Sequence, residues 1–148
     1  MLQKETLVQL IGYQSREYKQ ACELRYRLFF AEHDLPWEIV LDDEDINFHA
    51  AIILQNNVVA YGQLIAKNSF VYQVKQMVVE PKYQKQNLGR QILQSLINLA
   101  RQQGATDITL NARLFAVGFY QKLGFQTYGS QFPSATTGVI HIPMRQKL

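Results

Sequence analysis

The segment of residues 70–104 constrains the fold most, because it joins a strand to an amphipathic helix through a polar turn. Phe70–Val79 is rich in β-branched and aromatic residues, which favours a strand, and Pro81 ends it because proline has no N–H for a strand ladder. A helix is expected from about Leu88, with Gly104 as its C-cap. Its buried stripe is expected to consist of Gly89, Ile92, Leu93, Leu96, Ile97 and Ala100. A strand followed by such a helix is typical of α/β proteins.

Strands and helices on both sides of this segment predict a mixed sheet. Helices are expected over Ser15–Phe30, which opens on a serine suited to an N-cap, and over Phe115–Leu123. The remaining strands are expected at Thr6–Ile11, His49–Leu54, Val58–Ala66, Asp107–Asn111, Phe125–Ser130 and Gly138–Arg145. The turn Gln55–Asn57 favours antiparallel neighbours, and the later strand–helix–strand order favours a parallel crossover. We therefore expect one α/β domain over residues 1–148, with a mixed, mostly antiparallel sheet flanked by helices.

Composition and charge exclude several classes of protein. Apolar residues make up 47% and charged residues 18% of the chain, which is an ordinary globular balance. The net charge of +3 is scattered rather than gathered in a run, which argues against nucleic-acid binding but suits a polyanionic small molecule. Cys22 is the only cysteine, so a disulfide within the chain and a Cys-rich zinc site are excluded, and we expect no metal. The single cysteine is consistent with a reducing cytosol, so we expect a cytoplasmic protein. We expect no membrane contact, because no stretch approaches the ~20 apolar residues of a membrane span.

The polar turn at residues 84–90 has the properties of an anion-binding site. The first N–H groups of a helix have no partner within it and carry the positive end of its dipole, so a phosphate there receives several hydrogen bonds. Gly89 allows a close approach of the backbone, and Asn87 tolerates a left-handed conformation. Lys85 and Arg90 add positive charge. The same pattern also occurs in ordinary strand–turn–helix connections, and it matches neither a P-loop nor a dinucleotide fingerprint.

Two segments together resemble the GNAT N-acetyltransferase superfamily. In the first, Pro81-x-Tyr83 precedes a match to the acetyl-CoA signature Gln/Arg-x-x-Gly-x-Gly/Ala. Gln84 takes the first position of that signature, and Asn87 stands in place of the middle glycine. The second segment, residues 116–125, is similar to A-x-x-L/F-Y-x-K-x-G-F and follows about 30 residues later, with a helix and a strand between them. Arg113 stands seven residues before the tyrosine, where the superfamily usually has asparagine.

The flanking regions resemble the ElaA-like branch of this superfamily. The N-terminal residues that carry this resemblance are Leu24, Arg25, Phe29, Glu32, Pro36, Asp42, Asp43 and His49. The C-terminal pattern is Gly138-x-x-His141-x-x-Met144. The resemblance implies a splayed central strand pair, in which Gln76–Val79 offers backbone groups to the pantetheine arm of coenzyme A. It implies cofactor contacts at Met77, Val78, Val79, Gln84, Lys85, Gln86, Asn87, Leu88, Gly89, Arg90, Asn111, Phe119, Tyr120 and Lys122.

The resemblance also implies direct transfer of an acyl group to an amine in a ternary complex. Tyr120 is the expected general acid for the leaving thiol, and packing within its helix is the alternative interpretation. The base is open among a water molecule and the side chains of Glu80, Glu32, His49 and His141. Glu80, His49 and His141 also have ordinary structural interpretations. The residues expected at the acceptor are Glu32, Trp37, His49 and Gln73, and a core anchor is the alternative interpretation of Trp37. The acidic run Asp42–Asp45 is either an attraction for a cationic amine or a solvated loop.

The resemblance therefore predicts an N-acetyltransferase that moves an acetyl group from acetyl-CoA to a primary amine of a small molecule or peptide. A homodimer is compatible with the superfamily. The alternative is a non-catalytic acyl-CoA-binding or regulatory module on the same fold. Gln73 favours that alternative, because it lies where some relatives carry a catalytic glutamate and glutamine cannot act as a base. A purely structural protein on this fold would leave the two paired segments unexplained.

Overall fold

The computed structural model describes residues 7–41 and 47–148, so Thr6 and the acidic run Asp42–Asp45 lie outside the described residues. Eight strands in that part of the chain form one sheet in the order β1-β2-β3-β4-β5-β8-β6, with β7 paired to β8. The strands are β1 (Val8–Leu10), β2 (Phe48–Leu54), β3 (Asn57–Ala66), β4 (Val71–Val79), β5 (Asp107–Arg113), β6 (Gln126–Thr127), β7 (Phe132–Pro133) and β8 (Ile140–Lys147). Among them only β4 and β5 pair in parallel, which confirms the predicted mixed, mostly antiparallel sheet.

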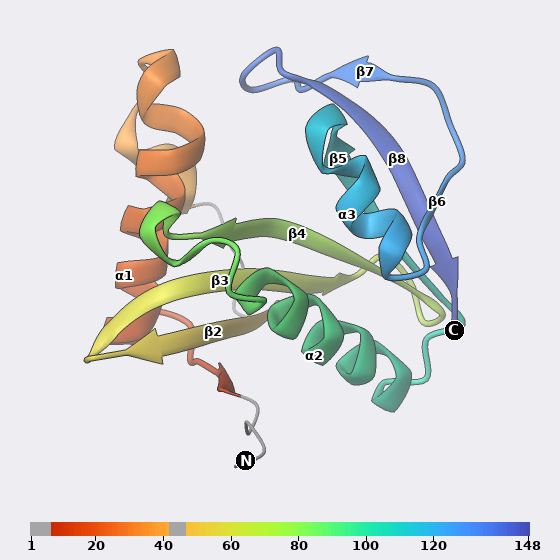
Figure 1. The fold of residues 1–148 in the computed structure, drawn as a ribbon, viewed down its shortest axis with the longest axis horizontal. Coiled ribbons are helices and arrows are strands. Elements are labelled where there is room, and N and C mark those ends of the chain that lie inside the picture. Colours follow the sequence, from red (N-terminus) through yellow and green to blue (C-terminus); the bar gives the residue numbers. More distant parts are fainter. Residues whose placement is uncertain (1–6, 42–46) are drawn as a thin grey trace.

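Helices cover both faces of this sheet (Figure 1). The α-helices of the described residues are α1 (Arg16–Arg25), α2 (Leu88–Gln102) and α3 (Val117–Lys122). Shorter helical turns lie at Tyr26–Phe30, Ala31–His33, Trp37–Leu41, Pro81–Tyr83 and Leu114–Ala116. The buried residues of α2 and α3 join one hydrophobic cluster and those of α1 join others, so α2 and α3 lie on one face and α1 on the other. No helix in the described residues has the length and apolar character needed to cross a membrane.

The predicted apolar stripe of α2 is confirmed. Ile92, Leu93 and Leu96 are fully buried in the cluster that joins α2 to the sheet. Gly62 of β3 makes this close packing possible, because a methyl group there would lie 2.7 Å from Met77 Sδ and 2.8 Å from Ile92 Cγ2. The helix therefore sits directly on the sheet where β3 and β4 are least regular.

The sheet separates between β4 and β5, and we call the gap between these two strands the split. These strands pair only through Val71–Gln73 and Asp107–Thr109. Further along β4, Gln76 adopts a left-handed conformation with a φ of 58°, and the ladder shifts so that Gln76 and Met77 lie opposite Gly62. A bulge of this kind bends its strand and increases the local twist. Figure 1 shows β4 running to the left, whereas β8 descends from the top of the view to the C-terminus. The short pairing of β4 with β5 confirms the expected splayed strand pair.

The structure differs from the prediction in the type of the first helix and in one short strand. The helix that begins after Ser15 changes at Tyr26 into a wider π turn that ends at Phe30. The Ser15 cap itself is confirmed, because its hydroxyl accepts the N–H of Tyr18 at 3.1 Å. The short strand β7 was not predicted, because a pair of residues carries no readable periodicity.

Candidate active site

The turn before α2 forms a concave group of backbone N–H donors. Lys85 and Asn87 each have a φ of 65°, so left-handed residues alternate with Gln86 and Leu88. The left-handed conformation predicted for Asn87 is confirmed, whereas nothing in the sequence indicated it for Lys85. Within the described residues no backbone acceptor meets the N–H groups of residues 85–87, and those of the first turn of α2 have no partner in the helix. Such a nest of N–H groups binds phosphate oxygens.

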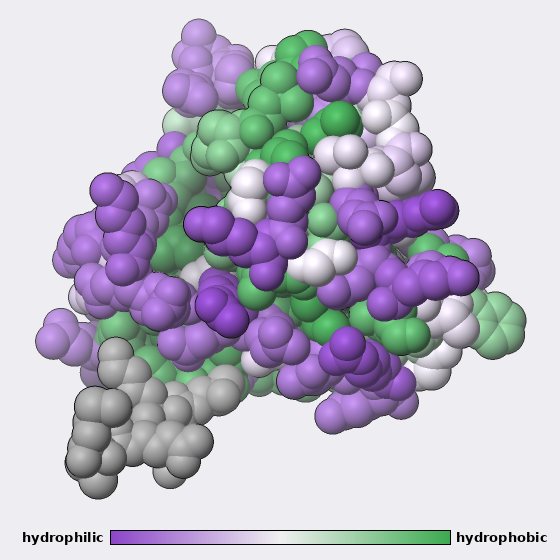
Figure 2. Space-filling model, turned by 45° about the vertical axis from the view of Figure 1, so that its right-hand side comes forward, coloured by the Kyte–Doolittle hydropathy of each residue, from purple (hydrophilic) through white to green (hydrophobic). Residues whose placement is uncertain are grey.

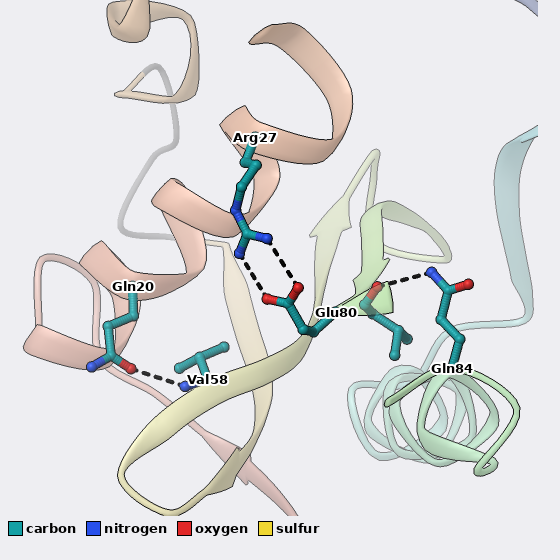
Figure 3. A network of polar contacts seen from close by, with 6 residues as sticks. Gln20, Arg27, Val58, Glu80 and Gln84 are labelled. Carbon is teal, nitrogen blue, oxygen red and sulfur yellow. Dashed lines mark hydrogen bonds and ion pairs between the residues drawn. The ribbon is translucent and has the colours of Figure 1, made fainter. Parts of the chain in front are cut away.

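Gln84 holds the end of β4 in place. Its backbone N–H donates to Pro81 O at 3.2 Å, and its side-chain Nε2 donates to Val79 O at 3.1 Å (Figure 3). The next N–H along the chain, that of Glu80, donates to Val59 O in β3 at 2.8 Å. Because backbone groups alternate in direction along a strand, the Val79 N–H points away from β3, as its carbonyl does. Gln84 was expected to bind phosphate, but its backbone N–H and its side-chain amide donate to carbonyl groups of the protein. The Val79 N–H lies on the open side of β4, away from β3.

The two segments that carry the family resemblance meet at Gly89. A methyl group on Gly89 would lie 3.6 Å from Val79 Cγ2 and 3.7 Å from Phe119 Cζ. The end of β4, the start of α2 and the side of α3 therefore converge on this residue. Phe119 in turn lies edge-on to Tyr120, with 5.1 Å between the ring centres. Residues about 30 positions apart in the sequence are thus neighbours, as a shared cofactor requires.

The environment of Tyr120 keeps its phenol protonated. The side chain is 9% exposed and belongs to the core between α3 and the sheet. Burial raises the pKa of Tyr120 to about 12, because the phenolate would lose its hydration. Its hydroxyl makes no hydrogen bond with any of the described residues. The proton is therefore present at neutral pH and is available to a ligand.

Glu80 is engaged in an ion pair with Arg27, a partner that the sequence did not indicate. Arg27 Nη1 donates to Oε1 at 2.9 Å, and Nη2 donates to Oε2 at 2.7 Å (Figure 3). These hydrogen bonds lower the pKa of Glu80 from its ordinary value. A carboxylate with a lowered pKa is a weaker base, which argues against the base role expected for Glu80. The pair instead ties the end of β4 to the π turn that follows α1.

His141 presents one ring nitrogen as an acceptor. It lies in β8 directly opposite Arg113 of β5, so the two side chains share a face of the sheet. Its Nδ1 is 2.8 Å from Val139 O, and because a carbonyl oxygen can only accept, Nδ1 carries the proton of the neutral ring. The lone pair is then on Nε2. Phe132 of β7 stacks on the ring, with 6.0 Å between centres, and holds this orientation.

The residues expected at the acceptor do not converge. His49 is 2% exposed, and its Nδ1 lies 2.6 Å from the Tyr61 hydroxyl under α1, which fits the structural interpretation. Glu32 is exposed beyond the π turn, and Trp37 is partly exposed rather than a core anchor. Gln73 alone stands at the split, because it is the last residue of β4 that pairs with β5.

The remaining residues expected at the cofactor lie on different faces of the sheet and differ in their exposure. Met77 and Val79 pack against the α2 side of the core, whereas Val78 belongs to the cluster under α1. Asn111 is exposed between buried neighbours of β5, so its side chain stands on the face opposite α3. Lys122 is exposed in the last turn of α3.

A buried arginine supports the bulge of β4. Arg25 is 2% exposed, and its Nε donates to Gln76 Oε1 at 3.2 Å. Its guanidinium lies over the ring of Tyr61, 5.3 Å from the centre. These partners are far apart in the sequence, and no local pattern predicts their contact. The bulge that opens the sheet is therefore anchored from the α1 side.

The rim beyond the end of β5 is apolar. Leu114, Phe115 and Phe119 are exposed there, Phe115 by 84%. Figure 2 shows hydrophobic surface gathered at the upper end of the molecule, above a mainly hydrophilic body. The open end of the split therefore adjoins exposed hydrophobic side chains.

Comparison with known proteins identifies the family. Residues 18–148 match the family described as Acetyltransferase (GNAT) domain, and the chain therefore belongs to the GNAT acetyltransferase family. A curated relative from Streptococcus pyogenes, described as an uncharacterized acetyltransferase in the arcA 3′ region, is 28% identical over 91 residues. That match covers 62% of this chain and 62% of the relative, so the chain spans less than two thirds of that relative's length.

Solved structures share the fold. Escherichia coli ElaA has a TM-score of 0.80 at 17% identity, over 95% of this chain and 98% of that chain. An aminoglycoside 6′-N-acetyltransferase in complex with coenzyme A has a TM-score of 0.75 at 18% identity, over 94% of this chain and 96% of that chain. At these identities the likeness concerns the fold alone, and it confirms the expected GNAT-like architecture.

Proposed function

We propose that the chain is a cytoplasmic N-acetyltransferase that moves an acetyl group from acetyl-CoA to the primary amine of a small molecule or peptide in a ternary complex. The proposal rests on the convergence at Gly89, where the N–H nest, the outward N–H of Val79 and the helix of Tyr120 come together. Membership of the GNAT family supports acyl transfer. A fold relative solved with coenzyme A supports that molecule as the cosubstrate.

The residues of the turn fit a pyrophosphate. Residues 85–90 supply backbone N–H groups that have no backbone partner in the part of the chain that the structure describes, and Lys85 and Arg90 are exposed cations beside them. No acidic residue occurs within residues 84–90. The open side of β4, with the Val79 N–H, fits the amide-bearing pantetheine arm because such an arm can pair with backbone groups.

Each reacting group has a counterpart in the protein. When bound, acetyl-CoA supplies a thioester, whose C–S bond is exchanged for a C–N bond while the thiol leaves. The Val79 N–H, held in place by its neighbours, donates to the carbonyl oxygen as negative charge develops. Tyr120 provides the proton that the leaving sulfur takes up. His141 Nε2 accepts the proton that the amine loses, and Glu80 stays paired with Arg27.

Calorimetry with acetyl-CoA tests the cofactor assignment, and thiol release over an amine panel tests the transfer. We expect binding together with amine-dependent thiol release. Failure to bind at millimolar acetyl-CoA would remove the proposal. Binding without thiol release for any amine would instead support the non-catalytic module, which the ion pairing of Glu80 favours.

Two substitutions of Asn87 test the nest directly. Asn87→Gly keeps the left-handed conformation accessible, and we expect the acetyl-CoA affinity of the wild type. Asn87→Val disfavours that conformation by roughly 1–2 kcal/mol, so we expect about tenfold weaker binding. Both variants remove the same amide, so equal affinities would show that the left-handed turn does not hold the cofactor.

A further inference from the structure

Arg113 lies at the open end of the split, on the face that α1 covers. It is the last residue of β5 and lies directly opposite His141 of β8. The intervening buried residues of β5 face α2 and α3, so alternation places Arg113 on the other side. Arg113 therefore points away from the core that contains Tyr120 and toward the side from which an acceptor would approach β4.

The guanidinium of Arg113 spans the split. It lies over the ring of Phe29, 4.9 Å from the ring centre. Phe29 belongs to the π turn that packs on β2, β3 and β4, on the other side of the split from β5. Phe29 packs against the cluster that contains Val78, near the end of β4. This cation–π contact favours a defined position of the guanidinium and uses none of its N–H donors, which stay available for hydrogen bonding.

The N–H edge of this guanidinium has no acceptor among the described residues. Arg113 is partly buried, yet it makes no hydrogen bond or ion pair with any of the described residues. Arg27, Arg25 and Arg101 each donate to an oxygen of another residue, whereas Arg113 does not, and among the described residues Arg145 shares this property. A stacked arginine with its donors unfilled is suited to two-pronged recognition of a carboxylate.

We propose that the acceptor is an amino acid, or a similar small amine whose carboxylate lies a few bonds from the amine. Arg113 binds the carboxylate, and His141 Nε2 faces the amine. Residues opposite each other in an antiparallel pair have Cβ atoms about 4.5–5.5 Å apart, so one small molecule can reach both side chains. This inference rests on the proposed acetyl transfer, and it predicts that polycationic amines are poor acceptors because Arg113 repels them.

The test compares amino acids with their carboxamides, using thiol release and expressing kcat/KM per neutral amine. In the wild type we expect the carboxylate to be preferred by about tenfold or more, the usual effect of a charged hydrogen bond. In Arg113→Gln we expect this preference to approach unity, through a higher KM with little change in kcat. Arg113→Lys is expected to retain part of the preference, because it keeps the charge but loses the planar fork.

Arg145→Gln is the matched control. Arg145 lies on the same face of the sheet and also stacks on a ring, that of Tyr128, at 5.2 Å from its centre. We expect this variant to keep the wild-type preference. The inference is wrong if the wild type does not prefer the carboxylate to the carboxamide, or if Arg113→Gln keeps the wild-type preference. Either result is compatible with acetyl transfer to carboxamides, so the proposed function would stand.

Calorimetry with acetyl-CoA tests whether Arg113 binds the cofactor phosphates rather than the carboxylate of the acceptor. If Arg113→Gln weakens acetyl-CoA binding tenfold, the arginine serves the cofactor phosphates and the inference is wrong. Unchanged acetyl-CoA affinity with a lost carboxylate preference supports it. Absence of thiol release with every amine would remove the proposed function, and this inference with it.

Discussion

The face of the sheet under α2 and α3 buries apolar side chains, whereas the face under α1 buries Arg25, His49 and Gln63. These three are the buried polar or charged residues among those the structure describes. Gln63 pairs directly with His49 across β2 and β3, and His49 packs edge-on to Tyr18 of α1, which places all three on the α1 side. One face is therefore held by hydrophobic packing and the other also by hydrogen bonds between distant residues.

The two faces of the sheet also differ in the roles that we propose for them. The α2 face carries the nest, Gly89 and Tyr120, which we propose to bind the cofactor. The α1 face carries Arg113 and His141, which we propose to meet the acceptor. Arg25 connects the two, because its bond to Gln76 supports the bulge that opens the sheet. We therefore expect substitutions on the α1 face to change geometry and those on the α2 face to change packing or chemistry.

The largest expected effect is on stability, from Arg25→Leu. The substitution keeps apolar volume but leaves Gln76 without its donor and removes the charge over Tyr61. Loss of one partner from a buried polar network costs about 2–4 kcal/mol of unfolding free energy, measured by urea denaturation. Arg16→Leu is the control, because Arg16 is exposed on the same helix, and we expect a change within about 0.5 kcal/mol. Equal effects would show that the buried polar contacts do not support the α1 face.

Tyr120→Phe should act on turnover instead. Removing the proposed proton donor is expected to lower kcat by about a hundredfold or more, with acetyl-CoA affinity and stability nearly unchanged. A wild-type rate for the phenylalanine variant would remove Tyr120 from the chemistry.

The pH dependence of Tyr120 provides a second check. With its pKa at about 12, we expect no loss of rate from phenol ionisation between pH 7 and 10. The folded pKa is raised, so the neutral phenol stabilises the fold fully below the unfolded value of about 10. That contribution is lost as the pH rises from about 10 through 12, and it should be missing from Tyr120→Phe in urea denaturation. A rate that falls near pH 9 in the wild type alone would show that the phenol ionises more readily than its burial implies.

The same contrast explains what the sequence could predict. The stripe of α2 was readable because helical periodicity is local and the face is uniformly apolar, and Asn87 signalled its own left-handed turn. The pair Arg27 and Glu80 was not readable, because its members are separated by 53 positions and each looks like a solvated charge. The bulge at Gln76 could not be predicted either, since glutamine rarely adopts a positive φ. Here the distant side chain of Arg25 stabilises the bulge.

Gly62→Ala tests the packing of the α2 face. The added methyl group would meet Met77 Sδ at 2.7 Å and Ile92 Cγ2 at 2.8 Å, so we expect a loss of about 1–3 kcal/mol in unfolding free energy. Gly118→Ala is the matched control, because nothing lies within 4 Å of the methyl group in α3. There we expect a gain of about 0.5–1 kcal/mol, since alanine favours a helix. A neutral Gly62→Ala would mean that α2 can move away from the sheet.

The smallest expected effect concerns Arg27 and Glu80, which lie on the exposed edge of the α1 side. A double-mutant cycle with Arg27→Gln and Glu80→Gln should give a coupling energy below about 1 kcal/mol at pH 7, because the side chains are 56% and 21% exposed and water screens them. The pKa of Glu80 is lowered, so the coupling is present above its ordinary value of 4.5 and is lost as the pH falls through the lower folded value. Urea denaturation at pH 7 and pH 3 measures both. A coupling above 2 kcal/mol that survives 1 M salt would place this pair with the buried contacts of Arg25, and the α1 face would then be polar and rigid out to its edge.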